Sequence, residues 1–383
     1  MQIRKKLSKY QQIMYIVYIL PVFGLMSVGQ GSDYLLYRII FPICMIGLIL
    51  KLAVTDYTKT EWIWMLVIGG LLILNLICNH EKTLVLTYMA IIGAKNTDLD
   101  KIIKWALWER IILTVITIGS ALLGITNNQL VKAMPKYING TWQSCNIYCY
   151  GYAHPNHAFL DLFTIALLLI LVYHEKMKWY GYLLLMIGMY TGYYYLVCRT
   201  GWYTWICCFL IFIVYQIVQK SKLRTAYLYL VSMIPVFVMV FSVAGVLLYH
   251  VQHNIPSSLG NHLNDMFTGR FGLAQECYPA IFTQIIGHIP RSGKDLGYIH
   301  LIYNYGWIIT AIGIVAYIRT MWKAIALKKD YLCLALAVMS GYLVGEVTPL
   351  NVGWNILWIY LSMVLFQSKS QNINIIKGEE KTK

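Results

Sequence analysis

The chain has 383 residues, of which 59% are hydrophobic and only 12% are charged. An ordinary soluble domain carries about 25% charged residues, so this composition excludes a soluble globular protein and predicts a membrane protein. The formal net charge of +15 would suggest nucleic-acid binding in a soluble chain. In a membrane protein, an excess of basic residues first indicates how the spans are oriented in the membrane, and we expect no nucleic-acid partner.

Twelve apolar runs approach the roughly 20 residues that a helix needs to cross a bilayer. They predict an all-α, polytopic membrane fold in a single domain over residues 1–366, followed by a polar cytoplasmic tail, 367–383. The predicted spans are 11–28, 34–54, 61–78, 83–94, 102–124, 157–173, 179–198, 200–218, 226–250, 298–318, 331–347 and 352–366. The fifth contains Glu109 and Arg110, so we expect its membrane part to begin near Ile111.

The distribution of lysine and arginine predicts the orientation of these spans. The basic N-terminus runs directly into the first apolar segment without a cleavage site, so the first helix is expected to be an anchor. With the N-terminus inside, 22 basic residues fall in cytoplasmic segments and seven in outer segments. By the positive-inside rule both termini are predicted to be cytoplasmic, and most of the net charge is an orientation signal.

Two long outer loops, 126–156 and 251–297, are the predicted locations of function, because long loops in compact proteins are usually functional. The outer side also carries three arginines beside glycines or in short polar turns, Arg199, Arg270 and Arg291. The guanidinium group is always charged and binds phosphate oxygens with paired hydrogen bonds, which makes these three candidates for diphosphate binding. For each of them, contact with lipid headgroups stays open as an alternative.

The sequence GYAHPNHAFLD closes the first outer loop and opens the next predicted span. Pro155 and Asn156 predict a turn and a helix start. The residues His154, His157 and Asp161 would then lie on one side of the first helical turns. The structural alternative is helix capping with aromatic packing. It is weakest for Asp161, because a carboxylate within hydrocarbon is costly unless it has a role.

Metal binding is a weak alternative for the same region. Cys145, Cys149, His154 and His157 are the right residue types for zinc, but the two pairs are separated by four residues where about 12 is usual. We therefore expect no metal and no other cofactor. The nine cysteines lie mostly within apolar runs, which indicates packing rather than a disulfide framework, although a Cys145–Cys149 bond stays open.

The second outer loop re-enters the membrane at a group of charged residues. Asp295 and His300 lie close in sequence to Arg291 and Lys294. Positive neighbours would keep the carboxylate ionised and able to accept a proton from a hydroxyl. Asp295 is therefore the first candidate for a catalytic base, followed by His300 and His154. The alternative is a helix N-cap, because Asp295 precedes the next span by three residues.

Five short motifs follow one another along the chain. They are G-x-x-H-P-N at the end of the first outer loop, x-R-T-G between two spans, G-R-F-G in the second outer loop, D-x-x-Y-(x7)-G entering a helix, and a late E-(x8)-N. This order resembles the Wzy-type polysaccharide polymerases and their relatives, the O-antigen ligases, over roughly residues 105–366. The resemblance adds supporting site residues, Asn156, His157, Asp161, Tyr298, Glu346 and Asn355.

The resemblance implies a glycosyltransferase that uses neither a sugar nucleotide nor a metal. It would transfer a growing glycan from undecaprenyl diphosphate to a lipid-linked repeat unit, in capsule, exopolysaccharide or O-antigen synthesis. The reaction would take place on the outer face of the cytoplasmic membrane of a bacterium, with arginines stabilising the leaving diphosphate. The expected partners are the lipid-linked oligosaccharide, membrane lipid, and a flippase and a chain-length regulator of the same pathway.

Three alternatives stay open. The ligase branch has a histidine-asparagine pair three residues before the tyrosine of the re-entry helix, whereas this chain has Asp295 and Leu296 there, which favours a polymerase. A flippase or transporter of lipid-linked oligosaccharide would place ionisable groups near the bilayer midplane and often shows repeated halves. Here the charges within spans lie toward their ends. A non-catalytic scaffold would tolerate replacement of the three arginines.

Overall fold

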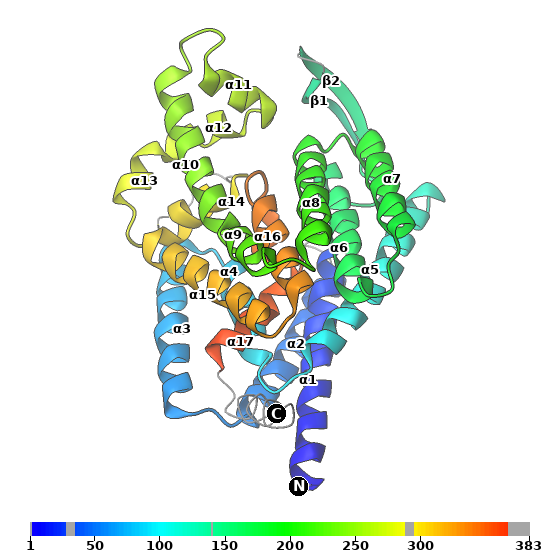
Figure 1. Cartoon of the computed structure of the whole chain (residues 1–383), viewed down its shortest axis with the longest axis vertical. Coiled ribbons are helices and arrows are strands. Elements are labelled where there is room, and N and C mark those ends of the chain that lie inside the picture. Colours follow the sequence, from blue (N-terminus) through cyan, green and yellow to red (C-terminus); the bar gives the residue numbers. More distant parts are fainter. Residues whose placement is uncertain (1, 28–34, 139–140, 288–294, 367–383) are drawn as a thin grey trace.

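The computed structural model describes residues 2–27, 35–138, 141–287 and 295–366. Within these ranges the regular secondary structure is helical apart from one two-stranded sheet. The sheet and the short helices α11 and α12 project from one end of the molecule, opposite the N-terminal end of α1 (Figure 1). The predicted tail, 367–383, and Arg291 lie outside the described residues.

The N-terminal part contains five helices and then the sheet. They are α1 (Gln2–Ser27), α2 (Leu35–Ala53), α3 (Lys59–Asn79), α4 (Thr83–Gly93), α5 (Leu99–Leu122), β1 (Leu130–Ile138) and β2 (Thr141–Tyr148). A capping box starts α3, because Thr58 accepts a hydrogen bond from the Glu61 amide and the Glu61 carboxylate accepts one from the Thr58 amide.

The middle and C-terminal parts alternate long helices with short turns of helix. The middle elements are α6 (Pro155–Tyr173), α7 (Trp179–Leu196), α8 (Arg199–Val218), α9 (Arg224–Ser232), α10 (Ile234–Gln252), α11 (Leu259–Met266), α12 (Arg270–Leu273), η2 (Gln275–Cys277) and α13 (Tyr278–Thr283). The last are α14 (Gly297–His300), the π-helical η3 (Leu301–Tyr305), α15 (Gly306–Ala326), α16 (Asp330–Tyr342), η4 (Thr348–Leu350), η5 (Ile356–Leu361) and α17 (Ser362–Leu365).

Five helical segments are long and apolar enough to cross a membrane among the residues described. They are Lys59–Asn79, Pro155–Tyr173, Arg199–Val218, Arg224–Gln252 and Gly297–Ala326. Large apolar side chains on α3 such as Ile63, Leu66 and Ile77 are exposed, as expected for a helix that faces lipid. The prediction of a mainly helical fold with apolar helices of membrane-spanning length is thereby confirmed, whereas the count of twelve spans stays a prediction.

Both predicted outer loops contain secondary structure that was not expected from their sequence. The loop 126–156 contains β1 and β2, an antiparallel pair with an irregular register between Val131 and Met134. The loop 251–297 contains α11, α12 and α13. The fold is therefore not strictly all-α. These segments are too short or too polar to form the long apolar runs from which the helices were predicted.

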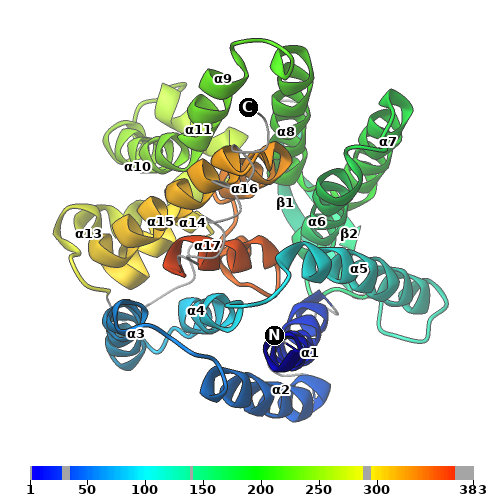
Figure 2. The same cartoon turned by 60° about the horizontal axis from the view of Figure 1, so that its bottom comes forward.

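The centre of the molecule is formed by α16 together with η5. Nearly every residue of α16 is buried, and this helix packs against α6, α8, α9, α10 and α15. In Figure 2, where the bottom of the molecule is turned toward the viewer, the longer helices surround this centre. The last turn of α16 and the segment that follows it therefore hold a fixed position relative to the ends of several other helices. One of the charged clusters of the molecule lies there.

Candidate functional site

Arg270, the first residue of α12, lies at the centre of a buried polar network. Its Nη2 donates a hydrogen bond to Glu346 Oε1 at 2.5 Å, and its Nη1 donates to Thr200 Oγ1 at 2.6 Å. Its Nε lies 3.6 Å from Asp295 Oδ2. The three nitrogen atoms of this guanidinium group thus contact three different segments of the chain, which fixes its orientation.

A fourth segment joins the network through Glu346. Asn156, in the first turn of α6, donates from Nδ2 to the same Oε1 of Glu346 at 2.8 Å, across 190 residues of sequence. Asn156 Oδ1 is buried and has no hydrogen-bond partner among the described residues. The network therefore retains one acceptor that could bind the hydroxyl of a ligand.

The backbone approaches this network closely where glycines occur. A Cβ on Gly345 would lie 2.1 Å from Thr200 Cγ2 and 2.8 Å from Arg270 Nη1, so any larger residue would displace one of them. On the other side, Gly269 adopts a φ of +80° immediately before Arg270, a conformation that glycine adopts without strain. Position 269 also lies close to Trp142, so the sheet extends to the segment that carries Arg270.

The charges of the network differ in their access to solvent. The side chains of Arg270 and Glu346 are 7% and 10% exposed, whereas that of Asp295 is 51% exposed. Burial alone would lower the pKa of Arg270, but the negative charges of Glu346 and Asp295 raise it above the usual arginine value. The guanidinium thus remains charged in a buried position, and Asp295 is the carboxylate that a bound hydroxyl could reach.

The other predicted arginine within the described residues, Arg199, has different surroundings. Arg199 begins α8, directly before Thr200, and is half-buried. Its Nη1 lies 3.5 Å from the carbonyl oxygen of Asp265, and its guanidinium carbon lies 5.7 Å from the centre of the Tyr203 ring. Arg199 thus lies in the first turn of α8, and Arg270 bonds Thr200 in the same turn.

The two predicted histidines of the first outer loop hold the start of α6. His154 is the N-cap residue of this helix, and its Nδ1 accepts a hydrogen bond from the Asn156 amide at 3.1 Å. The His157 ring packs against Trp354 with ring centres 5.0 Å apart. Both observations agree with the capping and packing alternative. This part of the chain nevertheless carries Asn156 into the network.

Asp161 forms a separate buried ion pair, one turn deeper in α6. Its Oδ1 lies 2.5 Å from Arg110 Nη1, and both side chains are fully buried. Its Oδ2 accepts hydrogen bonds from Tyr152 at 2.6 Å and Thr114 at 2.7 Å. Arg110 in turn donates to the carbonyl oxygen of Gly353 at 2.6 Å. Asp161 therefore joins α5 to α6, and sequence reasoning did not identify Arg110 as its partner.

His300 belongs to a third group, next to the end of α3. Its ring nitrogens lie 3.0 and 3.1 Å from Asn304 Nδ2. The Asn304 carbonyl oxygen accepts hydrogen bonds from the side chains of Asn75, at 3.2 Å, and Asn79. All these groups are buried. The structure thus pairs His300 with Asn304 of η3, which is held by amides of α3, rather than with the arginines of the Arg270 network.

The last two predicted residues, Tyr298 and Asn355, line an apolar cavity. Asn355 also caps η5, because its Oδ1 accepts a hydrogen bond from the Leu357 amide at 3.2 Å. Of the twelve predicted site residues, the network thus brings together Arg270, Glu346, Asp295 and Asn156. Sequence reasoning missed Thr200 and Gly345, although each directly adjoins a residue that it selected.

The structure describes all nine cysteines, and none of them forms a disulfide. No group of three or more histidine, cysteine or acidic side chains placed to hold a metal ion is found among the described residues. Comparison of the chain with protein-family models, with curated proteins and with solved structures finds no match. The function must therefore be argued from the residues and their geometry.

Proposed function

We propose that the chain is a polysaccharide polymerase that joins repeat units carried on undecaprenyl diphosphate. The observation that carries the proposal is the network of Arg270, Glu346, Thr200, Asp295 and Asn156. It combines a buried, fixed cation with an accessible carboxylate a few ångströms away. Transfer of a glycosyl group from a diphosphate requires a positive charge near the leaving group and a proton acceptor near the attacking hydroxyl.

In the proposed reaction, a hydroxyl oxygen of the acceptor sugar attacks the anomeric carbon of the donor glycan. The glycosidic C–O bond forms as the C–O bond to the diphosphate breaks, and the electron pair leaves with the diphosphate. Asp295 takes the hydroxyl proton and later releases it to water. Arg199, more accessible than Arg270, contacts the diphosphate, while Arg270 positions Asp295 and adds positive charge.

The proposal includes the topology expected from the sequence. Twelve spans with both termini in the cytoplasm would place loops 126–156 and 251–297, and with them the network, on the outer face of a bacterial cytoplasmic membrane. Lipid-linked repeat units become available on that face after a flippase has moved them across the bilayer. A chain-length regulator would be a further partner in the same membrane.

Reconstitution of the purified protein with a lipid-linked repeat unit tests the proposal, with the product sized by gel electrophoresis. A ladder of lengths is the expected result. Transfer to a distinct acceptor would identify a ligase instead. Movement of unchanged substrate across the vesicle membrane would identify a flippase, and either of these outcomes overturns the polymerase assignment. Arg199→Ala is expected to abolish the ladder while the protein still inserts.

A further inference from the structure

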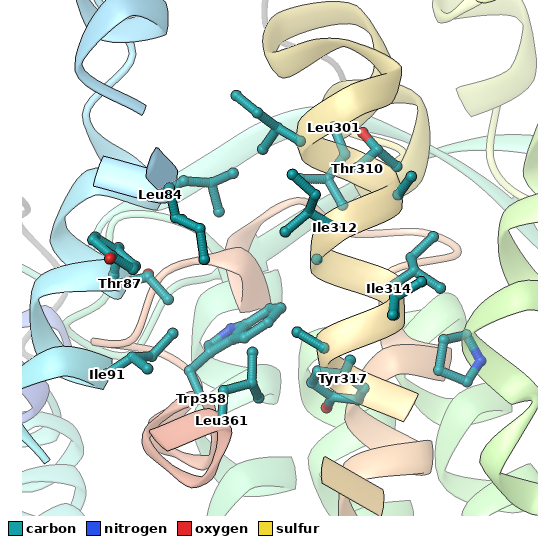
Figure 3. Close-up of a pocket in the computed structure, with 18 of the residues that line it drawn as sticks. Leu84, Thr87, Ile91, Leu301, Thr310, Ile312, Ile314, Tyr317, Trp358 and Leu361 are labelled. Atoms are coloured by element: carbon teal, nitrogen blue, oxygen red, sulfur yellow. The ribbon is translucent and has the colours of Figure 1, made fainter. Parts of the chain in front are cut away.

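A cavity of about 580 Å³ lies between α3, α4, α15 and the C-terminal segment η5–α17. This volume is within the roughly 300–1,000 Å³ typical of ligand pockets. Figure 3 shows Leu84, Thr87 and Ile91 of α4 on one side and α15 on the other. Trp358 lies between them, above Leu361. The helices α3 and α15 belong to segments that are apolar enough to span a membrane.

Away from Arg319, which lies at one end, the wall has few polar groups, and most of them are bonded within the protein. The hydroxyls of Thr87, Thr310 and Tyr317 donate to backbone carbonyl oxygens at 2.8–2.9 Å. The indole nitrogen of Trp358 does the same at 2.8 Å. The wall therefore offers a ligand hydrocarbon contacts and almost no hydrogen bonds, which selects an apolar chain over a sugar or a headgroup.

The cavity is elongated along α15 and accessible from outside. Every residue from Ile309 to Tyr317 lines it, as does Arg319, a length of about 15 Å at the rise of an α-helix. Three apolar residues of the wall, Trp64, Ile312 and Val315, are themselves exposed. A chain could therefore enter sideways from the surrounding bilayer.

One end of the cavity lies beside the Arg270 network. Tyr298 and Leu343 line the cavity, and the Leu343 carbonyl oxygen accepts a hydrogen bond from the Gly297 amide at 2.9 Å. A Cβ on Gly297 would lie 2.9 Å from the backbone oxygen of Glu346. The segment directly after α16 thus forms the cavity wall with Leu343 and, three residues later, supplies the carboxylate that binds Arg270.

We infer that this cavity holds the part of a polyprenyl chain nearest the diphosphate of the lipid-linked donor. The inference rests on the proposed function, and it identifies the lipid-binding part of the same site. It accounts for an apolar, membrane-accessible cavity that ends beside fixed arginines, because the ligand is an anionic headgroup on one long hydrocarbon chain. The headgroup points toward Arg270 and Arg199, and the chain runs along α15 toward Arg319.

Two glycines provide a matched pair of variants to test this. Gly313 lines the cavity and Gly70 of α3 does not, and an added Cβ would meet no atom within 4 Å at either position. Gly313→Trp would therefore add a large side chain to the cavity wall without a clash at Cβ, whereas Gly70→Trp adds the same side chain outside the cavity. A second cavity variant is Ala311→Trp, at an exposed position of the wall.

The measurement is binding of undecaprenyl diphosphate to the purified, detergent-solubilised protein by native mass spectrometry, with phosphatidylglycerol as the comparison lipid. Gly313→Trp and Ala311→Trp are expected to weaken undecaprenyl diphosphate binding at least about tenfold, because apolar contact area is lost, and Gly70→Trp to leave it unchanged. Arg199→Gln should weaken it too, and by more than Arg319→Gln does, because the headgroup lies at the Arg199 end.

Equal binding by the 313 and 70 variants would overturn the inference. Equally tight binding of phosphatidylglycerol would also overturn it, because the cavity would then be an ordinary lipid site. A loss of binding in Arg319→Gln alone would overturn the proposed orientation, because the headgroup would then lie at the Arg319 end. Failure of the proposed function looks different: the native protein would bind undecaprenyl diphosphate in the cavity but form no glycan product in the reconstitution assay.

Discussion

Arg270 and Glu346, 76 residues apart in sequence, form a buried ion pair with 2.5 Å between Nη2 and Oε1. Removal of one member of such a pair leaves an uncompensated buried charge, which typically costs about 3–5 kcal/mol. Arg270→Gln and Glu346→Gln alone should therefore both lower the thermal unfolding temperature of the purified protein and stop product formation.

The double substitution separates the two effects. Arg270→Gln with Glu346→Gln removes both charges and keeps groups that can form hydrogen bonds. It should recover much of the lost stability and none of the activity, because the proposed reaction needs the positive charge. Thermal unfolding and product sizing on the same preparation test this. A stable and active double variant would show that the ion pair is only structural.

Gly345 provides a steric test of the same network. Because a Cβ there would lie 2.1 Å from Thr200 and 2.8 Å from Arg270, Gly345→Ala must displace the hydrogen bond between them. We expect product formation to fall at least about tenfold, since small misplacements of positioning groups are costly in catalysis. The control is Gly341→Ala, four residues earlier, where an added Cβ meets no atom within 4 Å. Similar activity in both variants would contradict the prediction.

Asp295 is the proposed base, and its replacement should affect rate far more than stability. Asp295→Asn removes the proton acceptor while its shape is kept, so the turnover number is expected to fall about 10²–10⁴-fold. Asp98→Asn is the control, because its side chain is 45% exposed compared with 51% for Asp295. Initial rates of glycan transfer at saturating donor distinguish them. Unchanged turnover in Asp295→Asn would exclude it as the base.

Composition and apolar length were enough to predict a helical membrane protein, because both are local properties of the chain. The Asn139-Gly140 dipeptide is also a local signal, typical of a tight hairpin, and it was overlooked between the segments that form β1 and β2. The π-helical turn Leu301–Tyr305 has no comparable signal. Its apolar residues fit an α-helix equally well, so only packing distinguishes the two forms.

The site could be predicted only in part, because its contacts join distant segments. The motifs selected Arg270, Glu346, Asp295 and Asn156, but hydropathy and spacing do not show that Glu346 binds both Arg270 and Asn156. That depends on how α16 packs against its neighbours. The partner of Asp161 could not be predicted for the same reason, because Arg110 lies 51 residues away on α5.

That buried pair, Arg110 and Asp161, offers the sharpest contrast with the Arg270 network. Because Asp161 is surrounded by Arg110, Thr114 and Tyr152, its role is to hold α5 against α6. Asp161→Ala should destabilise the protein by about 3–5 kcal/mol, with activity falling only as the folded fraction falls.

Arg110→Gln with Asp161→Asn removes both charges and keeps hydrogen-bonding groups, so it should recover stability together with activity. In the Arg270 and Glu346 double variant, stability alone should return. Unfolding curves and product formation measured side by side test the contrast. If the Arg110 and Asp161 double variant is stable but inactive, Asp161 contributes to catalysis, and the polar region around α6 must be included in the site.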